Sequence, residues 1–324
     1  MTPAPGVTQQ HDGRRVNQQA GGASPALTRA RRGIADYVET ALPKIVLGPT
    51  LLCALIFVYG FIVWTAWLSF TESRILPRYD FAGLVQYIAL FANDRWWTAV
   101  KNLGIFAGLF IGFCLVTGLV LAILLDQRIR AEGFLRAVYL YPMALSFIVT
   151  GTAWRWILNP GLGLEHLVRQ LGFEHFTFDW IVTPGMSIYA VVIAGVWQST
   201  GFVMALFLAG LRGIDDAIIK AAQVDGAGPV RIYASIVIPS LRPVFFSSLI
   251  ILGHIAIKSF DLVMALTGGG PGFSSDLPAT FMYTFAFNRN QIGLGAASAM
   301  MMLMTVIAII VPMIYSETRR QRHG

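Results

Sequence analysis

The sequence predicts an all-α integral membrane protein with six membrane-spanning helices. Of its 324 residues, 56% are hydrophobic and 13% are charged, which leaves too little polar surface for a soluble domain of ordinary composition. A helix needs about 20 mainly apolar residues to cross the roughly 30 Å of hydrocarbon in a membrane. Strands of a membrane barrel would instead show segments of about ten residues with alternating polarity. Continuous apolar runs of helical length occur at residues 45–70, 103–125, 137–158, 186–211, 244–266 and 293–315.

The basic residues lie mainly on one side of the predicted spans. If the amino terminus is inside, most of the 24 Lys and Arg residues flank the inner ends. This bias is typical of a bacterial inner-membrane protein with both termini in the cytoplasm. It accounts for the net charge of +7, so we expect a lipid bilayer and no nucleic acid as a partner. Composition further predicts a disordered cytoplasmic tail at residues 1–33, a six-span domain at 34–316 and a basic cytoplasmic tail at 317–324.

Neither the cysteines nor the glycine-rich run indicates a ligand site. Cys53 and Cys114 lie within predicted spans and far apart in the sequence, which predicts packing residues and no disulfide or metal site. The run TGGGPG at residues 267–272 follows the fifth predicted span. It lacks the Lys-Ser/Thr of a phosphate loop and lies on the predicted outer side, so it indicates a turn.

The connection between the fourth and fifth spans, residues 212–239, is long and charged although its flanks are apolar. Asp215 and Asp216 can cap one helix, Gly226 can end it, and Pro229 can start a second helix. The apolar residues at helical spacing are Ile214, Ile218, Ala221 and Val224 in the first helix and Ile232 and Ile236 in the second. Such a pair can lie in the lipid interface. Its small residues fit another backbone better, so we expect a docking site for a cytoplasmic protein.

This loop resembles the signature of membrane subunits in binding-protein-dependent ABC importers, which reads Glu-Ala-Ala, three residues, Gly, nine residues, Ile, one residue, Leu-Pro. The matching residues, with the spacing intact, are Lys220, Ala221, Ala222, Gly226, Ile236, Ile238 and Pro239. DGAG, which begins at Asp225, matches the common continuation, whereas Lys220 replaces the usual Glu. GVWQSTGFVMALFLAGL and FDLVMALTGGGPG are similar to carbohydrate-importer permeases. HIAIKSFDLV, SSDLPATFMYTF and GLGAASAMMM are most similar to the glucose/mannose branch of these permeases.

The resemblance implies the fold of an ABC type I importer permease, with six spans and a cytoplasmic two-helix coupling loop. It implies an assembly with a second homologous permease, a dimer of ABC ATPases and a soluble sugar-binding protein. ATP and Mg²⁺ would bind to the ATPases, so this chain is expected to bind no cofactor or metal and to catalyse no reaction. The residues that the resemblance assigns to contact with the ATPase are Lys220, Ala221, Ala222, Asp225, Gly226, Ala227, Ile236 and Pro239.

Polar residues inside two spans are candidates for the substrate pathway. A neutral sugar needs hydrogen-bonding groups beside aromatic faces, and polar side chains at this depth are stable only against protein or water. The alternatives are hydrogen bonds between helices for the fourth span and a self-contained ion pair for the fifth. The candidates are Trp197, Gln198, Ser199 and Thr200 in the fourth span, and His254, Lys258 and Asp261 on one face of the fifth.

The sequence therefore predicts a permease subunit of an ATP-driven importer for glucose or a similar monosaccharide. The alternative from another class is an ion-coupled secondary sugar transporter, which would need intramembrane carboxylates or broken helices. Asp261 is the one carboxylate within the predicted spans, and such a transporter has no use for a docking loop.

Overall fold

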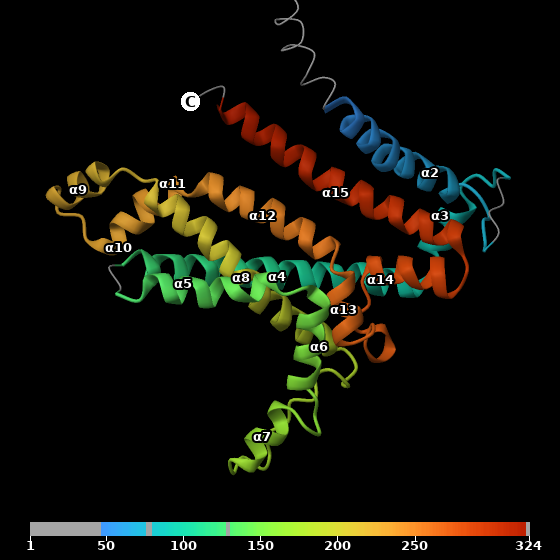
Figure 1. Ribbon diagram of the computed structural model, residues 1–324, viewed down its shortest axis with the longest axis horizontal. Coiled ribbons are helices and arrows are strands. Elements are labelled where there is room, and N and C mark those ends of the chain that lie inside the picture. The colour runs from blue at the N-terminus through green and yellow to red at the C-terminus, as the bar shows by residue number, and fades with distance from the viewer. Residues whose placement is uncertain (1–46, 76–79, 128–129, 322–324) are drawn as a thin grey trace, which may run out of the picture. The chain divides into compact units, whose positions relative to one another are not determined.

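The computed structural model describes residues 47–75, 80–127 and 130–321. Within these ranges the chain is helical and contains no strand (Figure 1), apart from an isolated antiparallel bridge between Thr71 and Phe81. The predicted all-α fold class is therefore confirmed. The predicted tail at residues 1–33 lies outside the described residues. Of the predicted tail at 317–324, the described part continues the last helix, α15 (Ile292–Gln321).

The chain divides into two units, Met1–Phe61 and Ile62–Gly324. The described part of the first unit is helical and contains a π-helical turn, η1 (Leu55–Tyr59), and the start of α2 (Gly60–Ser69). These turns belong to one apolar helix, Leu47–Ser69, that is long enough to cross a membrane. This helix agrees with the first predicted span.

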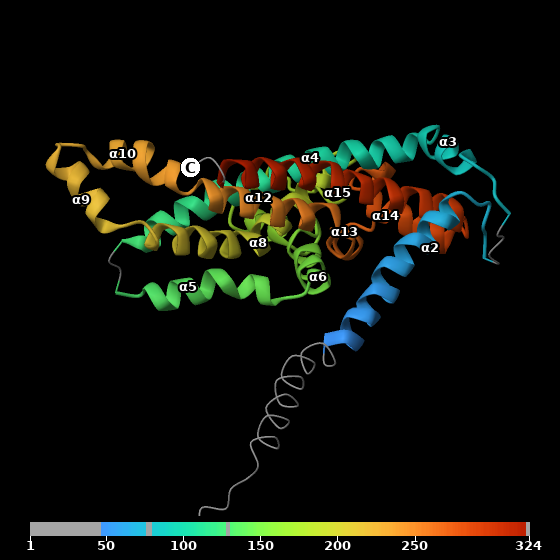
Figure 2. The same ribbon diagram turned by 90° about the horizontal axis from the view of Figure 1, so that it is seen from above.

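The second unit is built on two long helices that pack side by side, α4 (Asp94–Asp126) and α8 (Ser187–Arg212) (Figures 1 and 2). They approach closely at Gly118, where an added Cβ would lie 2.7 Å from a methyl group of Val203. Small residues permit such contacts between membrane helices. The two helices contain the second and fourth predicted spans.

The third predicted span, 137–158, is not one continuous helix but a bent pair of helices. The chain changes direction by 100° at an extended step formed by Leu145 and Ser146, whose ψ angles are 146° and 152°. Pro142 has no amide hydrogen to donate to a helix, and Ser146 Oγ accepts a hydrogen bond from the Val149 amide at 3.3 Å to cap the next helix. The parts are α5 (Glu132–Leu140), the 3-10 turn η2 (Tyr141–Ala144) and α6 (Phe147–Ile157).

The fifth predicted span, 244–266, is also divided, which corrects a second prediction. The helix stops at Lys258, and Ser259 takes a non-helical conformation with φ −73° and ψ 53°. The Ser259 hydroxyl donates to the Ile255 carbonyl at 2.8 Å, and the Phe260 amide turns back to the Lys258 carbonyl at 2.7 Å. Local bonds of this kind compete with the helical pattern. The parts are α12 (Arg242–Ile257) and α13 (Phe260–Leu266).

Among the described residues, four helices are long and apolar enough to cross a membrane alone, and six spans result if each of two bent pairs counts as one. The structure is therefore consistent with the predicted six spans but contains broken helices in place of straight ones. A broken helix is stable in a membrane only where protein or water satisfies its freed backbone groups. The bent pairs are Glu132–Ala144 with Phe147–Ile157, and Pro229–Ser240 with Arg242–Ile257.

Two short helices, α6 after Ser146 and α13 after Ser259, pack on each other. Their contact is centred on Gly151, where an added Cβ would lie 2.7 Å from the Cβ of Ala265. Figure 1 shows α6 leaving the α4–α8 pair at a steep angle and leading to α7. Outside residues 212–239, the remaining described helices are α3 (Val85–Phe91), α7 (Leu164–Gln170), η4 (Pro271–Phe273), α14 (Pro278–Tyr283) and η5 (Thr284–Asn288).

Candidate functional site

The connection between the fourth and fifth predicted spans, residues 212–239, forms the two helices that the sequence predicts. Asp215 Oδ1 accepts a hydrogen bond from the Ala217 amide at 2.9 Å and caps the first helix. Gly226 turns the chain with a φ of +79°, which glycine adopts without a steric penalty, and Pro229 begins the second helix. The helices are α9 (Asp216–Val224) and a continuous run of α10 (Pro229–Ile232), η3 (Tyr233–Val237) and α11 (Ile238–Ser240). We call these two helices the coupling hairpin.

One face of the coupling hairpin rests on the ends of the long helices, and the other face is exposed. Ala222 is buried, and Ile219 lines a cavity of about 250 Å³ between the hairpin and the ends of α4 and α8. By contrast, Ile218 is 51% exposed and Val224 is 87% exposed. The apolar stripe that contains them therefore points mainly outward.

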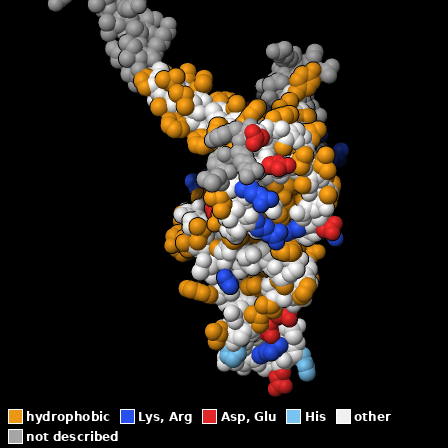
Figure 3. Space-filling view, turned by 90° about the vertical axis from the view of Figure 1, so that its right-hand side faces the viewer, with side chains coloured by type: hydrophobic (Ala, Val, Ile, Leu, Met, Phe, Trp, Pro, Cys, Tyr) orange, Lys and Arg blue, Asp and Glu red, His pale blue; other side chains and the backbone are white. Residues whose placement is uncertain are grey.

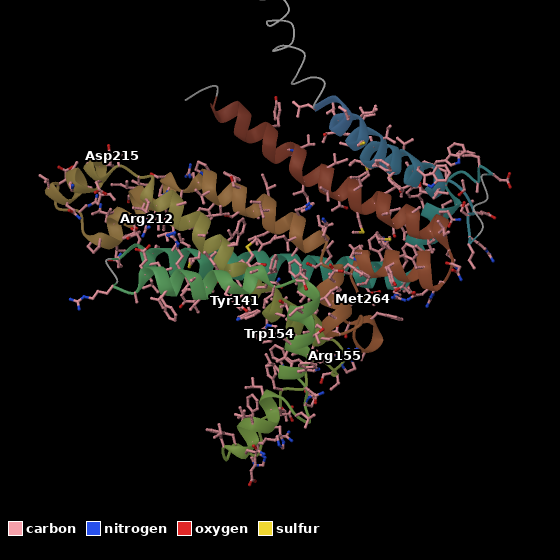
Figure 4. All side chains as sticks on the ribbon, in the orientation of Figure 1. Tyr141, Trp154, Arg155, Arg212, Asp215 and Met264 are labelled. Carbon is pink, nitrogen blue, oxygen red and sulfur yellow. The ribbon has the colours of Figure 1, made fainter. Side chains whose placement is uncertain are left out.

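Ion pairs at Arg212 join the ends of α4, α5 and α8 at the base of the coupling hairpin. Arg212 Nη2 lies 2.6 Å from Glu132 Oε1, and its Nε lies 3.9 Å from Asp126 Oδ1. Arg136 approaches the same Glu132 oxygen at 3.8 Å. Figure 4 shows Arg212 and Asp215 at the end of the second unit where α9 and α10 lie. Partly exposed pairs contribute little stability each, so their main effect is to fix the three helix ends relative to one another.

All the residues that the resemblance assigns to the ATPase lie on the two helices of the coupling hairpin or in the turn between them. Four of them are exposed, namely Lys220, Ala221, Asp225 and Gly226, and the others are buried or partly buried, namely Ala222, Ala227, Ile236 and Pro239. In the part of the chain that the structure describes, Lys220 forms no ion pair. Its ammonium group is therefore free to meet a carboxylate on another protein.

The polar residues of α8 contact other parts of this chain. Gln198 is 3% exposed, and its Nε2 donates a hydrogen bond to the Leu145 carbonyl at 2.8 Å. Thr200 Oγ1 donates to the carbonyl of Val196 in the same helix at 2.7 Å, and Ser199 is buried. The alternative interpretation, a hydrogen bond between helices, therefore describes Gln198 in this conformation.

Trp197 is the most exposed member of the α8 group, at 42%. Its ring meets the ring of Trp154 edge to face, with 5.9 Å between the centroids. Figure 4 shows Trp154 beside Arg155, with Tyr141 and Met264 nearby, around the break between α5 and α6. Aromatic faces next to polar groups can bind a sugar, so this region keeps its place as a candidate substrate contact.

The break in the fifth span separates His254 and Lys258 from Asp261. His254 lies near the end of α12, whereas Asp261 belongs to the first turn of α13, so the expected single helix face is not formed. All three side chains are exposed, and no ion pair joins Lys258 to Asp261. His254 lines a cavity of about 350 Å³ between α4, α12 and α15, where Thr305 is the other polar side chain.

A buried ion pair at the amino-terminal end of α4 was not predicted. Arg95 Nε lies 2.6 Å from Asp276 Oδ2, and the two side chains are 13% and 1% exposed. Thr280 Oγ1 donates to Asp276 Oδ1 at 2.5 Å, and Asn102 Nδ2 donates to the carbonyls of Phe273 and Asp276 at 3.0 Å each. These bonds fasten the connection between α13 and α14 to α4. Figure 3 views the molecule from this end, where charged side chains lie among hydrophobic ones.

The glycine-rich run belongs to the same network. It forms a turn, as predicted, in which Gly268, Gly269, Gly270 and Gly272 all have positive φ. Phe273 also has a positive φ, 61°, and the Arg95 guanidinium carbon lies 4.1 Å from the centroid of its ring. The sequence signal for this network is a single carboxylate, Asp276, shortly after the glycine-rich run. Its partner is 181 residues away, and no sequence pattern joins the two.

Comparison with known proteins places this geometry in a family. Residues 104–320 match the family described as "Binding-protein-dependent transport system inner membrane component". The chain belongs to this family. A "Probable ABC transporter permease protein" of Pyrococcus horikoshii is 38% identical over 278 residues, which cover 85% of the chain and 95% of the relative. The xylose/arabinose import permease of Haloferax volcanii is 36% identical over 267 residues, which cover 81% and 84%.

The fold of the permease is also found in a solved transporter. A chain from the crystal structure of a bacterial ABC transporter involved in the import of the acidic polysaccharide alginate superposes with a TM-score of 0.75 at 20% identity. The superposition covers 88% of the permease and 98% of that chain. The predicted ABC importer permease fold is therefore confirmed. The protein is a non-catalytic membrane component, and both relatives given above are named as permeases.

Proposed function

We propose that the permease forms one half of the membrane pathway of an ATP-driven sugar importer. Its coupling hairpin would transmit the closure of a cytoplasmic ATPase to the spans. The observation that carries this proposal is the hairpin itself, which is capped at Asp215, bent at Gly226 and exposed at Val224. Its base is held on α4 and α8 while its tip is free. A contact that differs between two states of the ATPase would therefore be transmitted to these helices.

The proposed assembly contains a second homologous permease, a dimer of ABC ATPases and a soluble sugar-binding protein. Both termini and the coupling hairpin are assigned to the cytoplasm, so the end with the Arg95–Asp276 pair faces the sugar-binding protein. ATP and Mg²⁺ are assigned to the ATPases. Among the described residues, no group of His, Cys, Asp and Glu side chains could hold a metal ion.

The proposed substrate is a monosaccharide of the glucose or mannose type. The similarity of HIAIKSFDLV, SSDLPATFMYTF and GLGAASAMMM to permeases of that branch supports this choice, and the Haloferax relative is named as a permease for the pentoses xylose and arabinose. The proposed contacts are the accessible candidates Trp197, Thr200, His254, Lys258 and Asp261. Gln198 and Ser199 are buried and would act from behind this surface.

The second candidate function is an ion-coupled secondary sugar transporter. The broken third and fifth spans favour it, because such transporters bind their substrates at discontinuous helices. Asp261 is its available carboxylate, at the start of α13. The exposed coupling hairpin and the family membership favour the ATP-driven importer, since a secondary transporter needs no cytoplasmic motor.

Uptake by proteoliposomes distinguishes the two candidates. The vesicles contain the permease, its companion permease and the ATPases, and the sugar-binding protein is added outside. We expect uptake of labelled glucose only when ATP is enclosed in the vesicles. This uptake should not change when ionophores collapse the Na⁺ and H⁺ gradients, and excess mannose should reduce it. Uptake that continues without ATP and stops with the ionophores would contradict the proposed function.

A further inference from the structure

The break between α5 and α6 is fastened to α8 by one directional bond. The carbonyl of Leu145 lies at the break, where the extended backbone removes it from any helical hydrogen-bond pattern. Gln198 Nε2 donates to this carbonyl at 2.8 Å. The Oε1 atom of the same amide is buried and has no hydrogen-bond partner among the described residues. A buried amide oxygen without a hydrogen-bond partner costs free energy. In this conformation the Gln198 amide therefore holds the break through its nitrogen, while its oxygen raises the free energy of the state.

The chain before the break is fixed to α8 by close packing. A Cβ added to Gly201 in α8 would collide with the carbonyl oxygen of Tyr139 in α5. Gly118 of α4 meets Val203 of α8 in the same way. Interiors packed this closely do not deform gradually. The three helices α4, α5 and α8 therefore behave as one body on the near side of the break.

The short helices on the far side form a second body. Gly151 of α6 packs so closely on α13 that an added Cβ would lie 3.0 Å from the Leu262 carbonyl. Each helix of this pair follows a break, the first at Leu145 and the second at Ser259. The ring contact between Trp154 and Trp197 joins this pair to α8, and buried Leu262 of α13 packs against α8 at Gly195. Apolar contacts of this kind are not directional and tolerate small rotations, whereas the Gln198 bond does not.

From this geometry we propose that Gln198 is a positioning residue for transport. It sets the angle of α6 at the break, and α6 and α13 turn as one unit about the two breaks when the transporter changes state. Its hydrogen bond belongs to one of the two states, so it biases the equilibrium between them. The inference rests on the alternating states of the proposed function but does not depend on which sugar is carried.

Distances between spin labels on α6 and α4 test this role in the assembled transporter. Labels are attached through Trp156→Cys on α6 and Val116→Cys on α4, whose side chains are 72% and 62% exposed, after Cys53→Ser and Cys114→Ala. We expect two label-to-label distances, one for each state, and the ratio of their populations should change when a non-hydrolysable ATP analogue is added. Gln198→Met keeps the length of the side chain without the donor, and losing one hydrogen bond should change the ratio about five-fold.

The matched control is Thr152→Val on α6, whose hydroxyl donates only to the Ile148 carbonyl of the same helix, at 2.9 Å. We expect it to leave the ratio unchanged. If Gln198→Met does not assemble, Gln198→Asn is measured with the same expectation, because its shorter side chain ends one methylene before Leu145. The proposal is overturned if the population ratio of the parent does not change with nucleotide. It is also overturned if the parent and the Gln198 variant have the same ratio.

Glucose uptake by the same vesicles separates this inference from the proposed function. Uptake with unchanging label distances overturns the positioning role alone. Distances that respond to nucleotide and to Gln198→Met in vesicles that take up no glucose support the positioning role and overturn the proposed substrate.

Discussion

Substituting Gly226 with Val is expected to leave the permease in the membrane and to abolish its co-purification with the ATPase. Gly226 has a φ of +79°, a conformation that a β-branched residue adopts only with strain. No atom lies within 4 Å of an added Cβ, so the effect acts through the backbone and not through a collision. The turn would open, and α9 and α10 would lose their relative orientation. The measurement is ATPase recovery with a tagged permease from solubilised membranes, relative to the amount of permease.

Gly226→Asn is the matched variant, because Asn tolerates a positive φ better than other side chains. It is expected to recover most of the ATPase. Normal recovery with Gly226→Val would contradict the docking role of the turn. Loss with both variants would contradict the conformational explanation.

Substituting Asp276 with Ala is expected to lower the free energy of unfolding by about 3–5 kcal/mol, because it leaves a buried charge without its partner. The substitution removes the carboxylate that binds Arg95 and Thr280. The bonds from Asn102 to the backbone carbonyls of Phe273 and Asp276 are kept in this variant, so the lost free energy reports on the carboxylate itself. The measurement is the unfolding of the purified permease in mixed micelles with increasing SDS.

Two further variants test whether burial of the pair causes this effect. The double variant Arg95→Met with Asp276→Leu removes both charges, and it should be less destabilised than Asp276→Ala. Arg136→Ala breaks a pair with Glu132 whose side chains are 45% and 30% exposed, and it should cost less than about 1 kcal/mol. An Asp276→Ala variant as stable as Arg136→Ala would show that the buried pair does not stabilise the fold.

The coupling hairpin could be predicted because its signals are local. Asp215, Gly226 and Pro229 each determine backbone geometry within a few residues, and their spacing fixes the lengths of the two helices. The long apolar helices α4 and α8 were predictable for a similar reason. Continuous runs of apolar residues require burial in lipid, whatever the rest of the chain does.

Apolar content alone does not locate the breaks, because each lies between apolar runs, although Lys258 and Asp261 flank the second break. Ser146 and Ser259 mark the two breaks, but serine also occurs inside unbroken membrane helices such as α8. The Arg95–Asp276 pair depends on tertiary packing over 181 residues. The role of Gln198 was ambiguous for the same reason. Its acceptor is the Leu145 carbonyl, which lies at the bend between α5 and α6, and the sequence did not predict that bend.

Photo-cross-linking from the tip of the coupling hairpin most directly tests whether this loop connects the spans to an ATPase. A photoreactive phenylalanine replaces Val224, which is 87% exposed, or, as a control, Trp97, which is 52% exposed near the other end of α4. We expect a covalent product between the Val224 variant and the ATPase in assembled transporter, with a yield that changes on ATP binding, and none from Trp97. Val224 products with lipid alone, or equal ATPase products from both positions, would contradict the coupling role.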